Sequence, residues 1–164
     1  MKVVVDTNVA IAANGRNTHA SLTCQFECTE FLQELVSPMK RTQIVLDMQG
    51  MIFDEYSRHL NYKGEPGVGD IFFKYLHDHM YLGKKVRLIG ITPIGDEARG
   101  FNELPQNTVD KSDRKFLATA ITSNAVIVNA VDTDWHEHGE FITNLGVNVR
   151  QLCPDQACVA TAKP

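Results

Sequence analysis

The sequence predicts a three-layer α/β/α domain with a mostly parallel central sheet. Five short segments are rich in Val, Ile and Leu with little polar alternation, which is typical of strands covered on both faces. Segments with apolar residues at helical spacing lie between them, and alternation of strand and helix is the pattern of parallel sheets. With 164 residues, 43% of them hydrophobic, the chain is long enough for one domain and too short for two. We expect that domain over residues 1–152 and a poorly ordered tail over residues 153–164.

The predicted elements follow one another along the chain. The expected strands cover residues 2–5, 43–46, 86–91, 125–131 and 147–152. The expected helices cover about residues 20–36, 49–60, 70–82, 113–123 and 137–145. Three of these helices should end at Ser37-Pro38, Gly83 and Gly146. Two stretches rich in turn-forming residues, 61–69 and 92–107, predict loops, and loops as long as the second tend to border functional sites.

The charge balance limits the classes of function. The net charge is −4, from 20 acidic and 16 basic residues, which disfavours a module that binds nucleic acid through a broad basic face. It leaves room for a nucleic-acid enzyme whose acidic residues are offset by bound cations. Basic residues cluster at Lys40-Arg41, Lys84-Lys85-Arg87 and Lys111-Arg114-Lys115. Ordinary solvated surface charge explains any one of these clusters equally well.

No segment approaches the roughly 20 apolar residues that span a bilayer, and Asp6 interrupts the first apolar run. We therefore expect a cytoplasmic protein with no membrane segment. The cysteines form two loose pairs, Cys24 with Cys28 and Cys153 with Cys158. This spacing is wider than that of a typical zinc site, so we expect free thiols in a reducing compartment.

Carboxylates follow or open several of the predicted core elements. Asp6 follows the first strand, Asp132 and Asp134 follow the strand over 125–131, Asp113 opens a helix and Glu55 lies in another. The carboxyl edge of an open parallel sheet is where ligands bind. Acids that converge there repel one another unless some are protonated or a divalent cation neutralises them. The sequence therefore predicts a metal site, and hard oxygen ligands select Mg²⁺ or Mn²⁺.

Each acid also has an ordinary alternative. Asp6 could cap the following helix, and Asp110 or Asp113 could cap a later one. Glu55 could lie on the solvent side of its helix, and Asp132-Thr133-Asp134 could form an Asx-turn. Four independent capping or turn roles nevertheless explain the joint occurrence less well than one shared site.

Four segments, in order along the chain, resemble the PIN-domain nucleases. They are Val4-Val5-Asp6-Thr7-Asn8-Val9, Phe53-Asp54-Glu55-Tyr56, Ser112-Asp113-Arg114-Lys115-Phe116-Leu117-Ala118-Thr119-Ala120 and Val131-Asp132-Thr133-Asp134-Trp135. The resemblance spans nearly the whole chain. It implies an α/β/α domain that holds Mg²⁺ or Mn²⁺ on carboxylates and cleaves RNA, in several cases as the toxin of a toxin–antitoxin pair. It implies catalytic and metal-binding roles for Asp6, Glu55, Asp113 and Asp132, with Asp134 as an additional or substitute ligand.

The chain departs from the family two residues before Asp132. The family often has Thr or Ser there, a hydroxyl suited to positioning substrate, and this chain has Ala130. This departure therefore bears on the catalytic rate more than on metal binding.

We therefore expect a metal-dependent endoribonuclease, because carboxylate-held metal ions can activate water and stabilise the charge on a phosphodiester. In this reading Thr7 or Asn8 orients a carboxylate or a phosphate, while Arg114 and Lys115 bind neighbouring phosphates. A solvated first-turn position is the alternative for Arg114. The expected partners are an RNA substrate, an antitoxin protein and a second copy of the chain.

Three other readings stay open. A PIN-like module could bind RNA or a protein without cleaving. A phosphatase or phosphotransferase could use Asp6 as nucleophile, although Asn8 stands where such enzymes usually need a second Asp. The histidine pairs at 77 and 79 and at 136 and 138 could suggest zinc or acid–base chemistry. The first pair lies in a predicted helix, where residues two apart face different ways.

Overall fold

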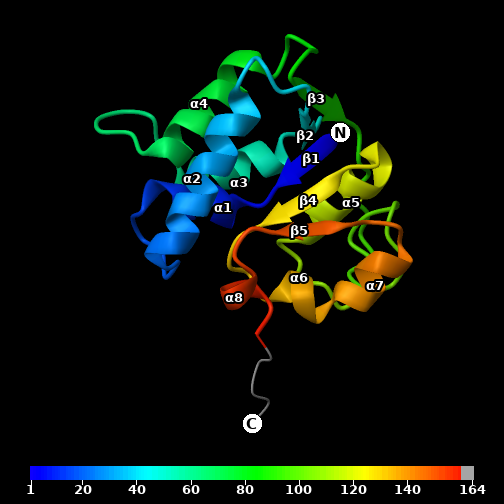
Figure 1. The fold of residues 1–164 in the computed structure, drawn as a ribbon. Coiled ribbons are helices and arrows are strands. Elements are labelled where there is room, and N and C mark those ends of the chain that lie inside the picture. The colour runs from blue at the N-terminus through cyan, green and yellow to red at the C-terminus, as the bar shows by residue number, and fades with distance from the viewer. Residues whose placement is uncertain (160–164) are drawn as a thin grey trace.

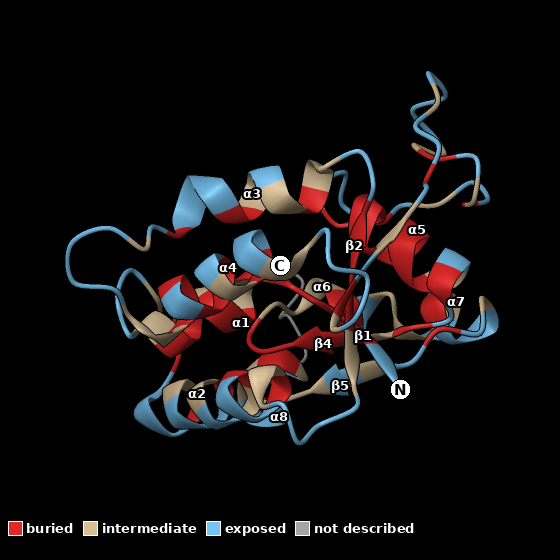
Figure 2. Cartoon of the chain, turned by 90° about the horizontal axis from the view of Figure 1, so that it is seen from above, coloured by how far each residue is buried: buried red, intermediate tan, exposed pale blue. Residues whose placement is uncertain are grey.

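The apolar segments form the expected parallel sheet. The structure, a computed structural model, describes residues 1–159 and contains a five-stranded sheet in which every pairing is parallel. The strands are β1 (Lys2–Val5), β2 (Gln43–Asp47), β3 (Val86–Ile89), β4 (Val126–Asn129) and β5 (Val149–Gln151). Buried residues concentrate on the three central strands β1, β2 and β4 and on helix α5 (Arg114–Ser123), as Figure 2 shows in red.

Helices flank the sheet on both faces, which confirms the predicted α/β/α class. They are α1 (Thr7–Asn14), α2 (Leu22–Val36), α3 (Met51–His59), α4 (Val68–His79), α5, α6 (Asp134–Glu137), α7 (Gly139–Asn144) and α8 (Pro154–Ala157). Figure 1 shows α1 to α4 on one side of the sheet and α5 to α7 on the other. None of the helices within residues 1–159 is long and apolar enough to cross a membrane.

The strand order reverses direction at one place along the sheet. The order is β3-β2-β1-β4-β5, so the chain winds outward from β1 to β3 and then crosses back to β4 on the other side of β1. In doubly wound sheets, ligands bind outside the carboxyl ends of the strands at such a reversal. Asp6 directly follows β1, and Asp132 lies in the turn after β4. The reversal point therefore lies beside two of the predicted site residues.

The element prediction missed helix α1 and the short helices α6 and α8. Helix α1 begins immediately after β1, and both its capping signals are present. The Asp6 carboxylate accepts from the Asn8 N–H, and Gly15 ends the helix with a left-handed backbone. The helix predicted over 137–145 corresponds to α7, which starts at Gly139, and α6 ends at Glu137, where the predicted helix begins.

The predictions for the cysteines and for the C-terminal segment need correction. Cys24 of α2 and Cys153 form a disulfide between residues 129 positions apart, while Cys28 and Cys158 are free. The disulfide fixes the chain after β5, and the Gln156 side chain accepts from the Ser21 N–H at 2.8 Å. The described part of the predicted tail therefore includes the ordered helix α8, and residues 160–164 lie outside the described residues.

Candidate metal centre

Two hydrogen bonds hold the carboxylate of Asp6. It is buried at the end of β1, and one carboxylate oxygen accepts from the Asn8 N–H at 3.1 Å. The other oxygen accepts from the indole N–H of Trp135 at 2.6 Å. A buried Trp N–H needs an acceptor, and here that acceptor is the Asp6 carboxylate. These two contacts fix the direction in which the Asp6 carboxylate points.

Three of the predicted acids meet at the reversal point of the sheet. Asp6, Asp113 before α5 and Asp132 after β4 each offer a carboxylate oxygen, and these oxygens lie within 4.8 Å of one another. The Asp113 side chain makes no capping hydrogen bond with α5, although it stands at the N-cap. The expected alternative, in which Asp113 serves only as a cap, is therefore wrong. Its carboxylate faces two other acids instead.

Burial and mutual repulsion raise the pKa values of these acids. The pKa of Asp113 rises from its ordinary 3.8 to about 8, first because of burial and then because of the charges of Asp6 and Asp132. The pKa of Asp6 rises to about 6, again mainly through burial and despite the hydrogen bonds that lower it. Without a cation, the folded protein therefore favours protonation of this group of acids.

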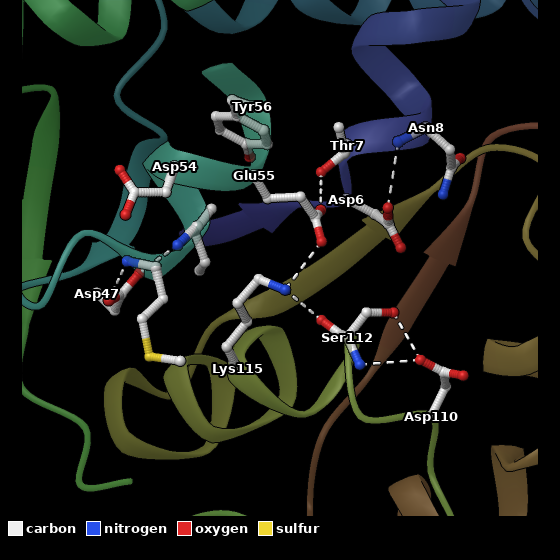
Figure 3. A network of polar contacts seen from close by, with 12 residues as sticks. Asp6, Thr7, Asn8, Asp47, Asp54, Glu55, Tyr56, Asp110, Ser112 and Lys115 are labelled. Carbon is white, nitrogen blue, oxygen red and sulfur yellow. Dashed lines mark hydrogen bonds and ion pairs between the residues drawn. The ribbon is translucent and has the colours of Figure 1, made fainter. Parts of the chain in front are cut away.

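Glu55 lies beside Asp6 but outside the group of three. One of its carboxylate oxygens accepts from the Lys115 ammonium at 2.8 Å, and the other accepts from the Thr7 hydroxyl. Figure 3 shows Glu55 between these two partners, next to Asp6. The Lys115 ammonium also donates to the Ser112 carbonyl. The sequence predicted Glu55 as a metal ligand, whereas the structure engages both of its oxygens in other contacts.

Lys115 is correspondingly buried, with its side chain 10% exposed and that of Glu55 14% exposed. It lies in the first turn of α5, which packs against β1 and β2 and is buried around its start. The expected role of Lys115 in binding phosphate stays a prediction. What the structure establishes is an ion pair beside the three carboxylates.

Asn8 and Asp134 support the site without joining the group of three. The Asn8 side-chain oxygen accepts from the N–H groups of Ala130 at 2.9 Å and Val131 at 3.1 Å. This contact holds the turn that carries Asp132. Asp134 starts α6, and burial together with the Asp132 charge raises its pKa. Its backbone N–H donates to the Asp132 carboxylate at 3.0 Å.

Arg114 makes contacts that differ from both expectations, the phosphate contact and the solvated position. The residue is 7% exposed, and its guanidinium donates to the carbonyls of Glu97 at 2.6 Å, Val109 at 3.0 Å and Asn107 at 3.4 Å. These carbonyls belong to the long segment before α5, where the sequence predicted a loop. The expected phosphate contact is therefore replaced by one that fixes this loop on α5. The solvated alternative is wrong as well.

The residues that the sequence reasoning missed are Trp135 as a partner of Asp6 and Lys115 as a partner of Glu55. Trp135 did carry a signal, because it is the chain's one tryptophan and directly follows Asp134. The Lys115 contact joins residues 60 positions apart, and no local pattern reports it.

Comparison with known proteins adds no assignment. No known family model matches the chain, and no curated protein matches it. Three carboxylates suit a hard divalent cation, and the Asp113 carboxylate makes no capping hydrogen bond that would compete with such a ligand. Mg²⁺ and Mn²⁺ are the cations that fit this donor set.

Proposed function

We propose that the protein is a metal-dependent endoribonuclease of the PIN type. The observation that carries the proposal is the convergence of Asp6, Asp113 and Asp132 at the reversal point of the sheet. The family resemblance of the four sequence segments agrees with this position. Mg²⁺ or Mn²⁺ is the proposed cofactor, and RNA is the proposed substrate.

The residues of the chain have separate roles in this proposal. A divalent cation bound there would supply water activation and would offset negative charge on the scissile phosphate. Asp6, Asp113 and Asp132 hold that cation, and Asp134 is the additional acid next to them. Trp135 and Asn8 position Asp6, because they donate to its two oxygens.

The pair of Lys115 and Glu55 favours a second candidate, a PIN-like module that binds RNA or a protein with little or no cleavage. The ion pair removes Glu55 from the ligands that the resemblance implies. Ala130 also lacks the hydroxyl that the family often places there. Binding of RNA without cleavage in Mn²⁺ would support this candidate over the first.

An antitoxin protein and a second copy of the chain are proposed partners.

The cytoplasm is the proposed location. Disulfides are rare in cytosolic proteins, so the Cys24–Cys153 bond bears on this last point. Thiol titration of protein purified under non-reducing conditions tests it. Four reactive thiols after denaturation would agree with a reducing compartment, and two would argue against it.

The test of the main proposal is cleavage of an end-labelled RNA in Mn²⁺, with a chelator as the first control. Asp113→Asn should lower the cleavage rate by about 100-fold or more, since it removes a metal ligand. Asp110→Asn is the matched control, because Asp110 lies three residues earlier and bonds to Ser112 instead of joining the three acids. Equal activity of the parent and Asp113→Asn would rule out the proposed centre.

A further inference from the structure

Two basic segments that are distant in the sequence meet at one pocket. Lys40 and Arg41 belong to the connection from α2 to β2, and Lys84 and Lys85 belong to the connection from α4 to β3. Because β2 and β3 are neighbouring parallel strands, both connections enter the sheet at the same edge, at the top of Figure 1. Between them lies a pocket of about 420 Å³.

The positive charge of this pocket is largely uncompensated. None of the described residues that line it is acidic. Lys85 is anchored by the carbonyls of Ser37 at 3.4 Å and Lys40 at 2.6 Å, so its ammonium stays at the pocket. Lys40 makes only a 3.6 Å pair with exposed Glu34. Four cationic side chains thus converge in a protein whose net charge is −4.

An aromatic and apolar wall stands beside these cations. Tyr75 and His79 of α4 stack with ring centroids 3.9 Å apart and planes 16° apart. A ring nitrogen of His79 lies 2.8 Å from the Tyr75 carbonyl, which fixes the stack. Leu82 also lines the pocket and is 60% exposed, so it adds accessible apolar surface to this wall. The pocket therefore combines anion-binding groups with flat apolar surface.

We propose that this pocket binds a nucleotide, with the cations on its phosphate and the Tyr75–His79 wall against its base. Cationic side chains beside stacking aromatics are the combination that binds single nucleotides of a strand. The volume lies within the range of small-ligand pockets. A free nucleotide and the terminal nucleotide of an RNA strand share this chemistry. The pocket lies at the edge of the sheet opposite Asp6, so the inference does not rest on the proposed nuclease centre.

The test is calorimetric titration with adenosine monophosphate and with inorganic phosphate, in metal-free buffer. The parent should bind adenosine monophosphate saturably. Arg41→Gln and Lys84→Gln should each weaken that binding by about tenfold, the effect of losing one contact to a charged group. Lys63→Gln is the matched control, because it removes the same charge from a different pocket, lined also by Arg16 and Arg58.

The aromatic wall is tested separately. Tyr75→Leu should weaken binding of adenosine monophosphate by about fivefold or more and leave inorganic phosphate unchanged, since stacking acts on the base alone. His79→Gln is a second variant in case the first unfolds, and thermal melting checks both. Unchanged affinity for adenosine monophosphate in folded forms of these two variants would overturn the nucleotide assignment.

Two further results would overturn the proposal: no saturable binding by the parent, or loss of binding in Lys63→Gln with retention in Arg41→Gln. A 5′-phosphorylated oligoribonucleotide distinguishes the two sources of the ligand. Competition with adenosine monophosphate assigns the pocket to an RNA end. If adenosine monophosphate binds saturably and the oligoribonucleotide does not compete with it, the pocket is assigned to a free nucleotide.

Discussion

Replacing Asp113 by Asn should stabilise the metal-free protein. The substitution removes a charge that burial and two neighbouring acids disfavour. It breaks no capping hydrogen bond, because the Asp113 side chain makes none. Asp6 is less suitable for this test, since both its oxygens accept from N–H donors and an Asn side chain would turn its NH₂ group toward one of them.

The raised pKa of Asp113 sets the size and the sign of the effect. Because this pKa is about 8 in the folded state against 3.8 ordinarily, the folded protein holds the proton more tightly than the unfolded chain. This group therefore lowers stability progressively as pH rises from about 4 to about 8. At pH 7 the full linkage is at most about 4 kcal/mol, and contact with water reduces it to about 1–3 kcal/mol. That range corresponds to a rise in Tm of about 3–10 °C.

Thermal melting of the parent, Asp113→Asn and the control Asp110→Asn, at several pH values from 4 to 8, measures this effect. The gain from Asp113→Asn should grow with pH, while the Asp110 variant should gain nothing, because hydrogen bonds from Ser112 lower the pKa of Asp110. Saturating Mn²⁺ should then stabilise the parent by about 2.7 kcal/mol at a hundredfold excess over Kd, and Asp113→Asn much less. Equal pH slopes for the parent and Asp113→Asn would refute the electrostatic argument.

Further predictions concern the ion pair, the core and the disulfide. Lys115→Gln should destabilise the metal-free protein by about 3 kcal/mol, because it leaves the largely buried carboxylate of Glu55 without its cationic partner. The same substitution should enlarge the stabilisation by Mn²⁺. Melts with and without Mn²⁺ decide this, and an unchanged response to metal would contradict it. Thr119→Val should stabilise by about 1 kcal/mol, because this buried hydroxyl has no hydrogen-bond partner among the described residues. Thr122→Val, which loses a bond to the Ala118 carbonyl, should not stabilise in the same urea titrations. Reducing the Cys24–Cys153 disulfide should cost about 4–5 kcal/mol by the loop-entropy model, and equal urea midpoints with and without reductant would contradict this.

The fold was predictable because its signals are local. Four of the five expected strands contain the observed one, and β2 extends one residue beyond its expected end, to Asp47. Other boundaries differ mainly because apolar runs such as 125–131 continue into the turns after the strands. The meeting of Asp6 and Asp132 follows from the rule for parallel sheets, which needs only the order of the elements. Sequence periodicity could establish these features without any knowledge of tertiary contacts.

The remaining features depend on contacts between distant residues. The Lys115–Glu55 pair spans 60 positions and the disulfide spans 129, so no spacing rule reports either of them. Arg114 was misread for a related reason. A basic residue in a first helical turn usually faces solvent, but here the loop before α5 folds over it and offers three carbonyls. Burial of a charged side chain depends on what covers it, and the covering segment has no regular pattern.

The contact between Trp135 and Asp6 has a practical consequence. The chain contains one tryptophan, and its indole donates directly to a carboxylate of the proposed metal centre. Indole fluorescence responds to nearby charge and is quenched by paramagnetic ions such as Mn²⁺. The emission of the unlabelled protein should therefore report protonation of the acids and arrival of a cation in real time. Trp135 can therefore serve as an intrinsic fluorescent probe of the proposed metal centre.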